Sequence, residues 1–253
     1  MAYRVPLHVL RRLGAAMLGM AQTSLSHDCE DYVRSARPSP LVEGEDNIPR
    51  QGSFCAIANH WERRGLWIGF PSSVLVTAVA RRRRGEPPLH FAVVEETRLA
   101  RGRVAVPGTA WAYRRVARCY GMVTVPPRPA QRAAQAAALR RLARHALMPP
   151  RGSGEPICFF PEGEGGTSAG MTEALPGSGA FLLLLSRAGV PMLPVGFAEV
   201  EGRLVARVGE TFTISVEEGG PRREQDRAAA TMAMRRVAAL VPPPWRGPYG
   251  GAG

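Results

Sequence analysis

Apolar residues near the N-terminus recur at intervals of three and four, at Leu7, Leu10, Leu13, Met17 and Met20. This spacing places them on one face of a helix, so it predicts a helix over residues 5–35. Arginines lie among these apolar positions, at Arg4, Arg11 and Arg12. The helix therefore either packs on the protein core or lies on a membrane with its arginines near lipid headgroups, and the pattern leaves both interpretations open.

Short apolar runs alternate with longer helical patterns after the polar segment 38–51, which is predicted to be a loop. The runs predict strands at residues 53–58, 89–94, 122–125, 156–160, 192–197, 204–208 and 212–216. Helices are predicted over residues 66–80, 111–120, 129–147, 180–188 and 222–240. Alternation of this kind is typical of an α/β domain. We therefore expect one domain with a largely parallel or mixed central sheet flanked by helices.

The expected organisation has two parts. Residues 1–37 are predicted to form an N-terminal amphipathic helical segment, for which membrane association is one of the two interpretations, and residues 38–250 the α/β domain. The length of 253 residues fits this division. The two longest apolar stretches, residues 66–80 and 179–197, fall short of the ~20 uninterrupted apolar residues that span a bilayer. No membrane-spanning helix and no signal peptide is predicted.

The charge of the chain narrows the classes of function. The formal net charge is +12, and all 33 basic residues are arginine. A chain without lysine has no P-loop lysine, no kinase lysine and no Schiff-base lysine. The positive charge attracts nucleic acids or anionic lipid headgroups. Neither an RNA-binding aromatic pattern nor a helix-turn-helix pattern occurs, so no nucleic-acid partner is expected.

Three further kinds of chemistry are disfavoured. The four cysteines form no CxxC pair, and three of them lie in apolar stretches and are predicted to be buried thiols, which favours a reducing compartment. No HExxH or other metal-ligand spacing occurs, so no metal site is predicted. Residues 166–170 match the GxSxG pattern of hydrolases, but the last histidine is His145, and that fold needs its histidine late in the chain.

Polar residues follow two of the predicted buried strands. Asn59 and His60 follow the strand at 53–58, and Pro161, Glu162 and Gly163 end the strand at 156–160. Ligands of α/β sheets bind where strands end, so we expect His60 and Glu162 to line one cleft. The alternative interpretation is structural, with His60 capping a helix and Glu162 holding a backbone turn.

These segments resemble the glycerophospholipid acyltransferases, typified by 1-acylglycerol-3-phosphate acyltransferase. Four blocks occur in the family's order: residues 41–60 ending in Asn-His, residues 121–125 followed by Arg128, the Phe-Pro-Glu-Gly run at 160–163, and residues 189–195. The resemblance covers about residues 40–250. The motifs are short, but their order and spacing are shared.

The resemblance implies transfer of a fatty acyl group from acyl-CoA or acyl-carrier protein to a lysophospholipid or related lipid hydroxyl. His60 would be the general base, with no cofactor beyond the acyl donor. The acceptor would be bound by Arg128, Phe160, Pro161, Glu162 and Gly163. The expected partners are membrane lipids and the acyl donor, and the expected location is peripheral, at the cytoplasmic face of a membrane.

The chain departs from the family at the His-x4-Asp motif. The position five residues after His60 is Gly65, and no aspartate occurs between Asp46 and Asp226. Glu62 is the carboxylate nearest in sequence and is predicted to share the catalytic site, while Glu95, Glu96 and Glu162 are other candidates that the fold can bring close. An alternative function follows from the same departure, namely a catalytically impaired relative that binds lipid or acyl chains.

Overall fold

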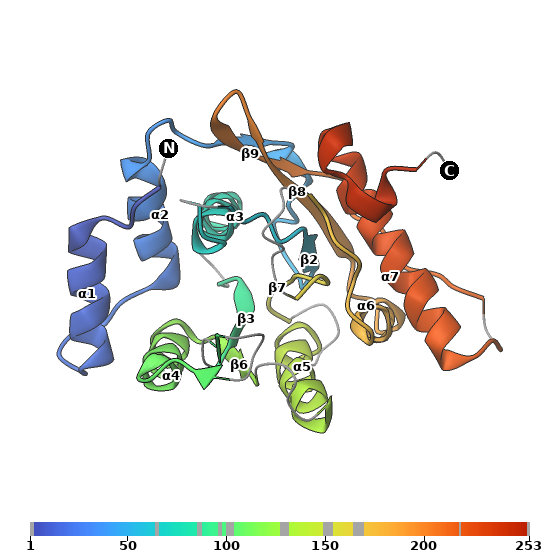
Figure 1. Ribbon diagram of the computed structural model, residues 1–253, viewed down its shortest axis with the longest axis horizontal. Helices are drawn as coiled ribbons and strands as arrows, with labels where there is room; N and C mark the ends of the chain where they lie inside the picture. The colour runs from blue at the N-terminus through green and yellow to red at the C-terminus, as the bar shows by residue number, and fades with distance from the viewer. Residues whose placement is uncertain are drawn as a thin grey trace.

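A seven-stranded sheet runs through the middle of the molecule (Figure 1). The computed structural model describes residues 3–63, 66–84, 88–95, 98–99, 104–126, 132–148, 154–163, 170–217 and 219–251. The strands are β1 (Leu41–Glu43), β2 (Cys55–Ala58), β3 (His90–Val94), β6 (Val123–Val125), β7 (Ile157–Phe159), β8 (Met192–Val200) and β9 (Arg203–Val208). Their order across the sheet is β1-β9-β8-β2-β7-β3-β6. Only β8 and β9 pair antiparallel, so the expected mixed α/β sheet is confirmed.

Strand β2 is at the centre of the sheet because both of its faces are covered. Every residue of β2 is fully buried, and the strand pairs in parallel with β7 on one side and β8 on the other. A continuous apolar run is what a strand covered by helices on both faces requires. A separate two-stranded sheet, β4 (Arg98–Leu99) with β5 (Val104–Ala105), was not predicted from the sequence.

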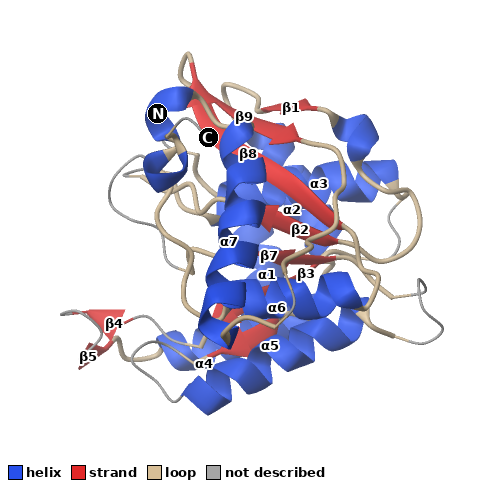
Figure 2. Cartoon of the chain, turned by 90° about the vertical axis from the view of Figure 1, so that its right-hand side faces the viewer, coloured by secondary structure: helices blue, strands red, loops and turns tan. Residues whose placement is uncertain are grey.

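Helices cover both faces of the sheet (Figures 1 and 2). One face carries α3 (Gly69–Arg82) and α4 (Thr109–Tyr120), and the other carries α5 (Arg132–Ala146), α6 (Ser178–Arg187) and α7 (Arg222–Ala239). The α6 N-terminus is capped from α7, since the Asp226 carboxylate accepts hydrogen bonds from Gly177 N–H at 2.7 Å and Ala180 N–H at 2.8 Å. Among the described helices, none is both long and apolar enough to cross a membrane.

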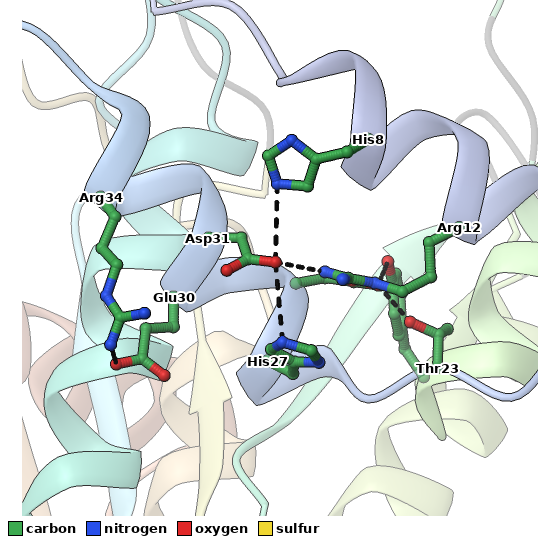
Figure 3. Close-up of polar contacts among 9 residues, drawn as sticks. His8, Arg12, Thr23, His27, Glu30, Asp31 and Arg34 are labelled. Carbon is green, nitrogen blue, oxygen red and sulfur yellow. Dashed lines mark hydrogen bonds and ion pairs between the residues drawn. The ribbon is translucent and has the colours of Figure 1, made fainter.

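The N-terminal segment forms two helices, so the prediction of one helix over residues 5–35 is wrong. Helix α1 (Leu7–Met17) ends just before Gly19, whose φ of +77° is a left-handed conformation that ends helices, and α2 (Leu25–Ser35) begins after a short link. Figure 3 shows Arg12 of α1 reaching Asp31 of α2, and the same guanidinium pairs with buried Asp28. Helix α2 packs on α3, where Tyr32 lies edge-on to Phe70 with 4.9 Å between ring centroids.

Two further predictions are wrong at the sheet edges. The segment 38–51 is not only a loop, because Leu41–Glu43 pairs with β9 as β1. The segment 212–216 is not a strand, since Phe212 makes only one bridge, to Met192. Strand β9 already pairs with β8 from Val195 onward, so Phe212 bonds to β8 only at Met192, the first residue of that strand.

Candidate active site

The candidate site lies at the carboxyl ends of β2 and β7. These strands are parallel neighbours, with Cys55 opposite Ile157 and Ile57 opposite Phe159. The residues that directly follow them therefore leave the sheet side by side. The backbone N–H of His60 donates a hydrogen bond to Oε2 of Glu162, 102 residues away in sequence. The sheet thus brings together the two residues that the sequence placed at separate strand ends.

Asn59 fixes the chain that carries His60. Its side-chain amide donates to the carbonyl of Phe197 at 2.9 Å and accepts from the N–H of Phe197 at 2.7 Å. Asn59 is buried, and Phe197 belongs to β8. A buried amide whose donor and acceptor are both satisfied holds a single orientation. The Asn-His pair is therefore anchored to β8 on one side and to Glu162 on the other.

The segment after β7 is a tight turn. Gly163 N–H donates to the carbonyl of Phe160 at 3.0 Å, and Gly163 has a φ of +73°, which glycine adopts without strain. Pro161 has a fixed φ that suits the second position of such a turn. Its carbonyl accepts from Leu175 N–H at 2.8 Å and from Ser178 Oγ at 3.0 Å, which joins the turn to the start of α6.

The Glu162 carboxylate is buried and bonded to backbone on both oxygens. Oε2 accepts from His60 N–H, and Oε1 accepts from Thr172 N–H at 2.5 Å. Burial raises the pKa of Glu162, and the hydrogen bonds from His60 and Thr172 oppose that rise. This geometry makes Glu162 a positioning residue for His60. Its predicted role in binding an acceptor stays a prediction.

The His60 imidazole lies in a largely apolar pocket. Its side chain is 12% exposed, and the ring packs edge-on against Phe160 with 5.6 Å between centroids. Burial lowers the pKa of His60 to about 4. Within the described part of the chain, Nδ1 is buried and has no hydrogen-bond partner. The ring is therefore neutral at pH 7, the state that a general base requires.

Glu62 is the carboxylate that faces His60. Its Oε2 lies 3.7 Å from His60 Nδ1, within ion-pair range but beyond a hydrogen bond. A helix would turn residues two positions apart in different directions, but residues 61–62 are not helical, so Glu62 can fold back onto the ring. Burial raises the pKa of Glu62, and a hydrogen bond from the Ile68 backbone opposes this.

The other predicted residues fall in two groups. Phe160, Pro161 and Gly163 form the turn beside His60, whereas Arg128 lies outside the described residues. Of the alternative carboxylates, Glu95 follows β3, and its backbone N–H donates to the carbonyl of Val125. No contact between Glu95 and His60 is seen. Gly65 and Glu96 lie outside the described residues.

Residues near the C-terminus also support the site, and the sequence did not assign them a role. Trp245 packs edge-on against Trp61 with 5.3 Å between centroids, and its carbonyl accepts from Met171 N–H at 2.8 Å. The Tyr249 hydroxyl accepts from Ala174 N–H at 2.9 Å. These contacts hold residues 171–174, which include the Thr172 N–H that binds Glu162. The only sequence signal was the Pro/Trp/Tyr content of the tail.

The arrangement of the chain can be compared with solved structures. The fold of this chain is similar to that of an acyltransferase. The crystal structure of the 1-acyl-sn-glycerophosphate (LPA) acyltransferase PlsC from Thermotoga maritima matches with a TM-score of 0.51 and 20% sequence identity, over 92% of this chain and 87% of that one. At that identity the likeness shows a shared fold. The chain matches no protein-family model and no curated protein sequence.

Proposed function

We propose that this protein is an acyltransferase that moves a fatty acyl group from acyl-CoA or acyl-carrier protein to the hydroxyl of a lysophospholipid or related lipid. The observation that carries the proposal is the buried, neutral His60, held by Glu162 and facing Glu62 at 3.7 Å. The fold shared with an acyltransferase supports it. A neutral imidazole backed by a carboxylate is the arrangement that activates a hydroxyl group.

The proposed reaction is direct transfer. Nδ1 of His60, on the side of Glu62, keeps its proton, so Nε2 takes the proton of the acceptor hydroxyl. The acceptor oxygen then bonds to the thioester carbonyl carbon, the C–S bond breaks, and the leaving thiolate takes the proton from His60. Glu62 stabilises the imidazolium that exists between these steps. The acyl donor is the only co-substrate, and no cofactor or metal takes part in the proposed step.

The acceptor is proposed to lie against the turn of Phe160, Pro161 and Gly163, with Arg128 as a further contact. The Phe160 ring already contacts the His60 ring, so an acceptor beside Phe160 has its hydroxyl near the base. Glu162, which the sequence predicts as a further acceptor contact, also holds the backbone of His60.

The lipid substrates of this reaction reside in membranes, and we propose that the N-terminal segment 1–37 brings the protein to one. Large apolar side chains are exposed on and beside α1, at Leu7, Leu10, Leu18 and Met20. Exposed Trp111 lies on α4, which packs against α1. Exposed arginines, Arg4 and Arg11, lie beside this apolar surface and suit anionic headgroups. Acyl-CoA and acyl-carrier protein are cytoplasmic donors, which favours the cytoplasmic face.

A second candidate function is lipid or acyl-chain binding without catalysis. The glycine at position 65, in place of the family's aspartate, favours it. The two candidates differ in what happens to a bound acyl donor, since only an enzyme consumes it.

The test is acyl transfer from labelled acyl-CoA and acyl-carrier protein to a panel of lysophospholipids. We expect turnover by the wild type, a loss of about 10²–10⁴-fold in His60→Ala, and no change in His27→Ala, which replaces an exposed histidine on α2. Melting curves show whether His60→Ala is folded. Binding of the acyl donor without turnover by the wild type, on any acceptor, would favour the second candidate.

A further inference from the structure

A second cluster of ionisable side chains lies at the amino ends of β3 and β7, whereas His60 follows the carboxyl end of β2. His90 is the first residue of β3, Glu155 precedes β7 by two positions, and His145 lies in the last turn of α5. Oε2 of Glu155 is 2.6 Å from Nε2 of His90 and 2.9 Å from Nδ1 of His145. One donor atom from each of the three residues lies within 4.8 Å of the others. The cluster takes no part in the reaction proposed above.

The two imidazole rings lie face to face, with 3.8 Å between centroids and 19° between planes. Both turn a ring nitrogen toward the same carboxylate oxygen. Two positively charged rings in that arrangement would repel each other. A neutral imidazole is the form that binds metal ions.

The hydrogen bond of His90 settles which of its nitrogens is free to bind. Nδ1 lies 3.2 Å from the carbonyl oxygen of Gly121, which can only accept, so Nδ1 carries the proton. In the neutral ring, Nε2 then presents a lone pair. The His90 side chain is 9% exposed, and Nε2 is buried and makes no aligned hydrogen bond within the described residues, although the Glu155 oxygen is close.

A buried lone pair close to a carboxylate oxygen is unfavourable, because neither acceptor has a donor there. A cation between them removes this conflict. The bond from Nδ1 to a backbone carbonyl is also the usual outer contact of a metal-bound histidine, where it fixes the tautomer and the orientation of the ring.

We propose that His90, His145 and Glu155 form a binding site for a divalent transition-metal ion, with zinc as the best fit. Two imidazole nitrogens and one carboxylate oxygen are a common protein donor set for zinc, with water completing a tetrahedron. Zinc–ligand distances of about 2.0–2.2 Å place neighbouring donors about 3.3 Å apart. The Glu155 oxygen therefore has to withdraw by less than about 1 Å from either histidine to admit an ion.

The surroundings of the cluster suit such an ion. The side chains of His145 and Glu155 are each 31% exposed, which leaves a path from solvent. A shallow groove beside His145 contains Glu95, Arg141 and Arg144, and its arginines favour an anionic group at the fourth position.

An ion here would join elements that are distant in sequence. His145 and Glu155 are 10 residues apart (155 − 145) and His90 is 55 residues before His145 (145 − 90), so no compact sequence motif predicts this group of three residues. Through its ligands the ion would connect α5, β3 and the entry to β7, and through Gly121 the turn between α4 and β6. We therefore expect binding to stabilise the fold.

The experiment uses the full chain without a histidine tag, first treated with EDTA and then titrated with ZnCl₂ by calorimetry. We expect one Zn²⁺ per chain, and a rise in Tm of about 5–10 °C when free Zn²⁺ is 100 times Kd, reversed by EDTA. His145→Ala and Glu155→Gln should each weaken binding at least ~10-fold. Both residues are partly exposed, which makes these variants better tolerated than a change at His90.

The matched control is His27→Ala, which removes a histidine that also faces a carboxylate, Asp31, but on the surface of α2. It should bind Zn²⁺ like the wild type. Visible absorption with Co²⁺ provides an independent readout, since tetrahedral sites with nitrogen and oxygen ligands give a characteristic d–d spectrum. Absence of binding to the wild type, or equal affinity in folded Glu155→Gln, would overturn the proposal and leave the cluster as an ion-pair network.

Discussion

Glu62 reaches the His60 ring because the chain after β2 leaves the sheet without forming a helix. The separation of 3.7 Å between Glu62 Oε2 and His60 Nδ1 is close enough to stabilise an imidazolium ion. The carboxylate is partly buried, which strengthens this interaction relative to one in water. In the proposed reaction, Glu62 therefore has the role that an aspartate five residues after the histidine has in the family that the sequence resembles.

Replacing Glu62 by glutamine keeps the shape of the side chain and removes its charge. We expect kcat to fall by about 10–10³-fold, because the imidazolium loses its counter-charge, with a smaller change in KM. Steady-state kinetics would measure the split between kcat and KM. Glu210→Gln, a change of the same kind at an exposed position, is the control and should leave both unchanged. Equal kinetics for wild type and Glu62→Gln would remove Glu62 from the mechanism.

The pH dependence of activity follows from the burial of His60. Because its pKa is lowered to about 4 from an ordinary value of 6.5, the base stays neutral well below pH 6. We expect kcat/KM to stay level from pH 7 to about pH 5 and to fall only near pH 4. A pH–rate profile measures this, and an acid limb centred near pH 6.5 would contradict the buried geometry.

Stability should follow the same titration. The unfolded chain binds a proton at His60 below about pH 6.5, whereas the folded chain does so only near pH 4. The stabilisation is therefore fully present above pH 6.5 and is lost as the pH falls toward 4, by about 2–4 kcal/mol in all. Denaturation of the wild type and a folded His60→Gln variant at pH 7 and pH 5 measures the difference, which should be smaller in the variant.

The helices of the N-terminal segment are joined by charge as well as by apolar contacts. Arg12 of α1 pairs with Asp28, which is buried and also accepts hydrogen bonds from Thr23 and Tyr120, and with Asp31 (Figure 3). Removing one partner of a buried pair leaves an uncompensated charge, which is far more destabilising than the loss of an exposed pair. Arg12 therefore ties α1 to α2 in addition to the apolar contacts of α1.

Arg12→Ala should lower the stability by about 2–4 kcal/mol, which corresponds to a fall in Tm of about 4–12 °C. Arg34→Ala is the matched control, because Arg34 pairs with Glu30 on the exposed side of α2. That variant should lose about 0.3–0.5 kcal/mol. Calorimetric melting compares the two, and equal losses would mean that the Arg12 pair contributes no more than a surface pair.

The two sides of the molecule differ in what they expose. Helix α1, blue in Figure 1, has exposed leucines beside exposed arginines, while the face covered by α5, α6 and α7 exposes Leu184 on α6 and Leu147 and Met148 after α5. A membrane with anionic lipids should therefore bind the molecule through α1, with favourable terms from both apolar burial and charge.

The double variant Leu10→Glu and Leu18→Glu should reduce sedimentation with phosphatidylglycerol-containing vesicles at least ~10-fold, because it removes two apolar contacts and adds negative charge. Leu184→Glu, the same change on α6, should bind like the wild type. Vesicle binding that is equal in the double variant and the control would exclude α1 as the membrane contact.

Much of the fold and part of the candidate site could be predicted, because buried segments have a local pattern of apolar residues in the sequence. The apolar run at 53–58 predicts β2, and the alternation of such runs with helices predicts the α/β sheet. The placement of His60 and Glu162 after two such runs predicts that they meet, which they do through the His60 N–H. The roles proposed for these residues stay predictions until activity is measured.

The remainder depends on contacts between residues far apart in the chain. The pairing of β1 with β9, the bonds of Asn59 to Phe197 across 138 positions, and the meeting of His90 with His145 and Glu155 leave no periodic pattern. Apolar periodicity records which face of an element is buried, whereas the partner of each polar group depends on where the whole chain brings its elements together. The sequence alone therefore determined most of the elements, and only the tertiary structure decided their order in the sheet and which polar groups face one another.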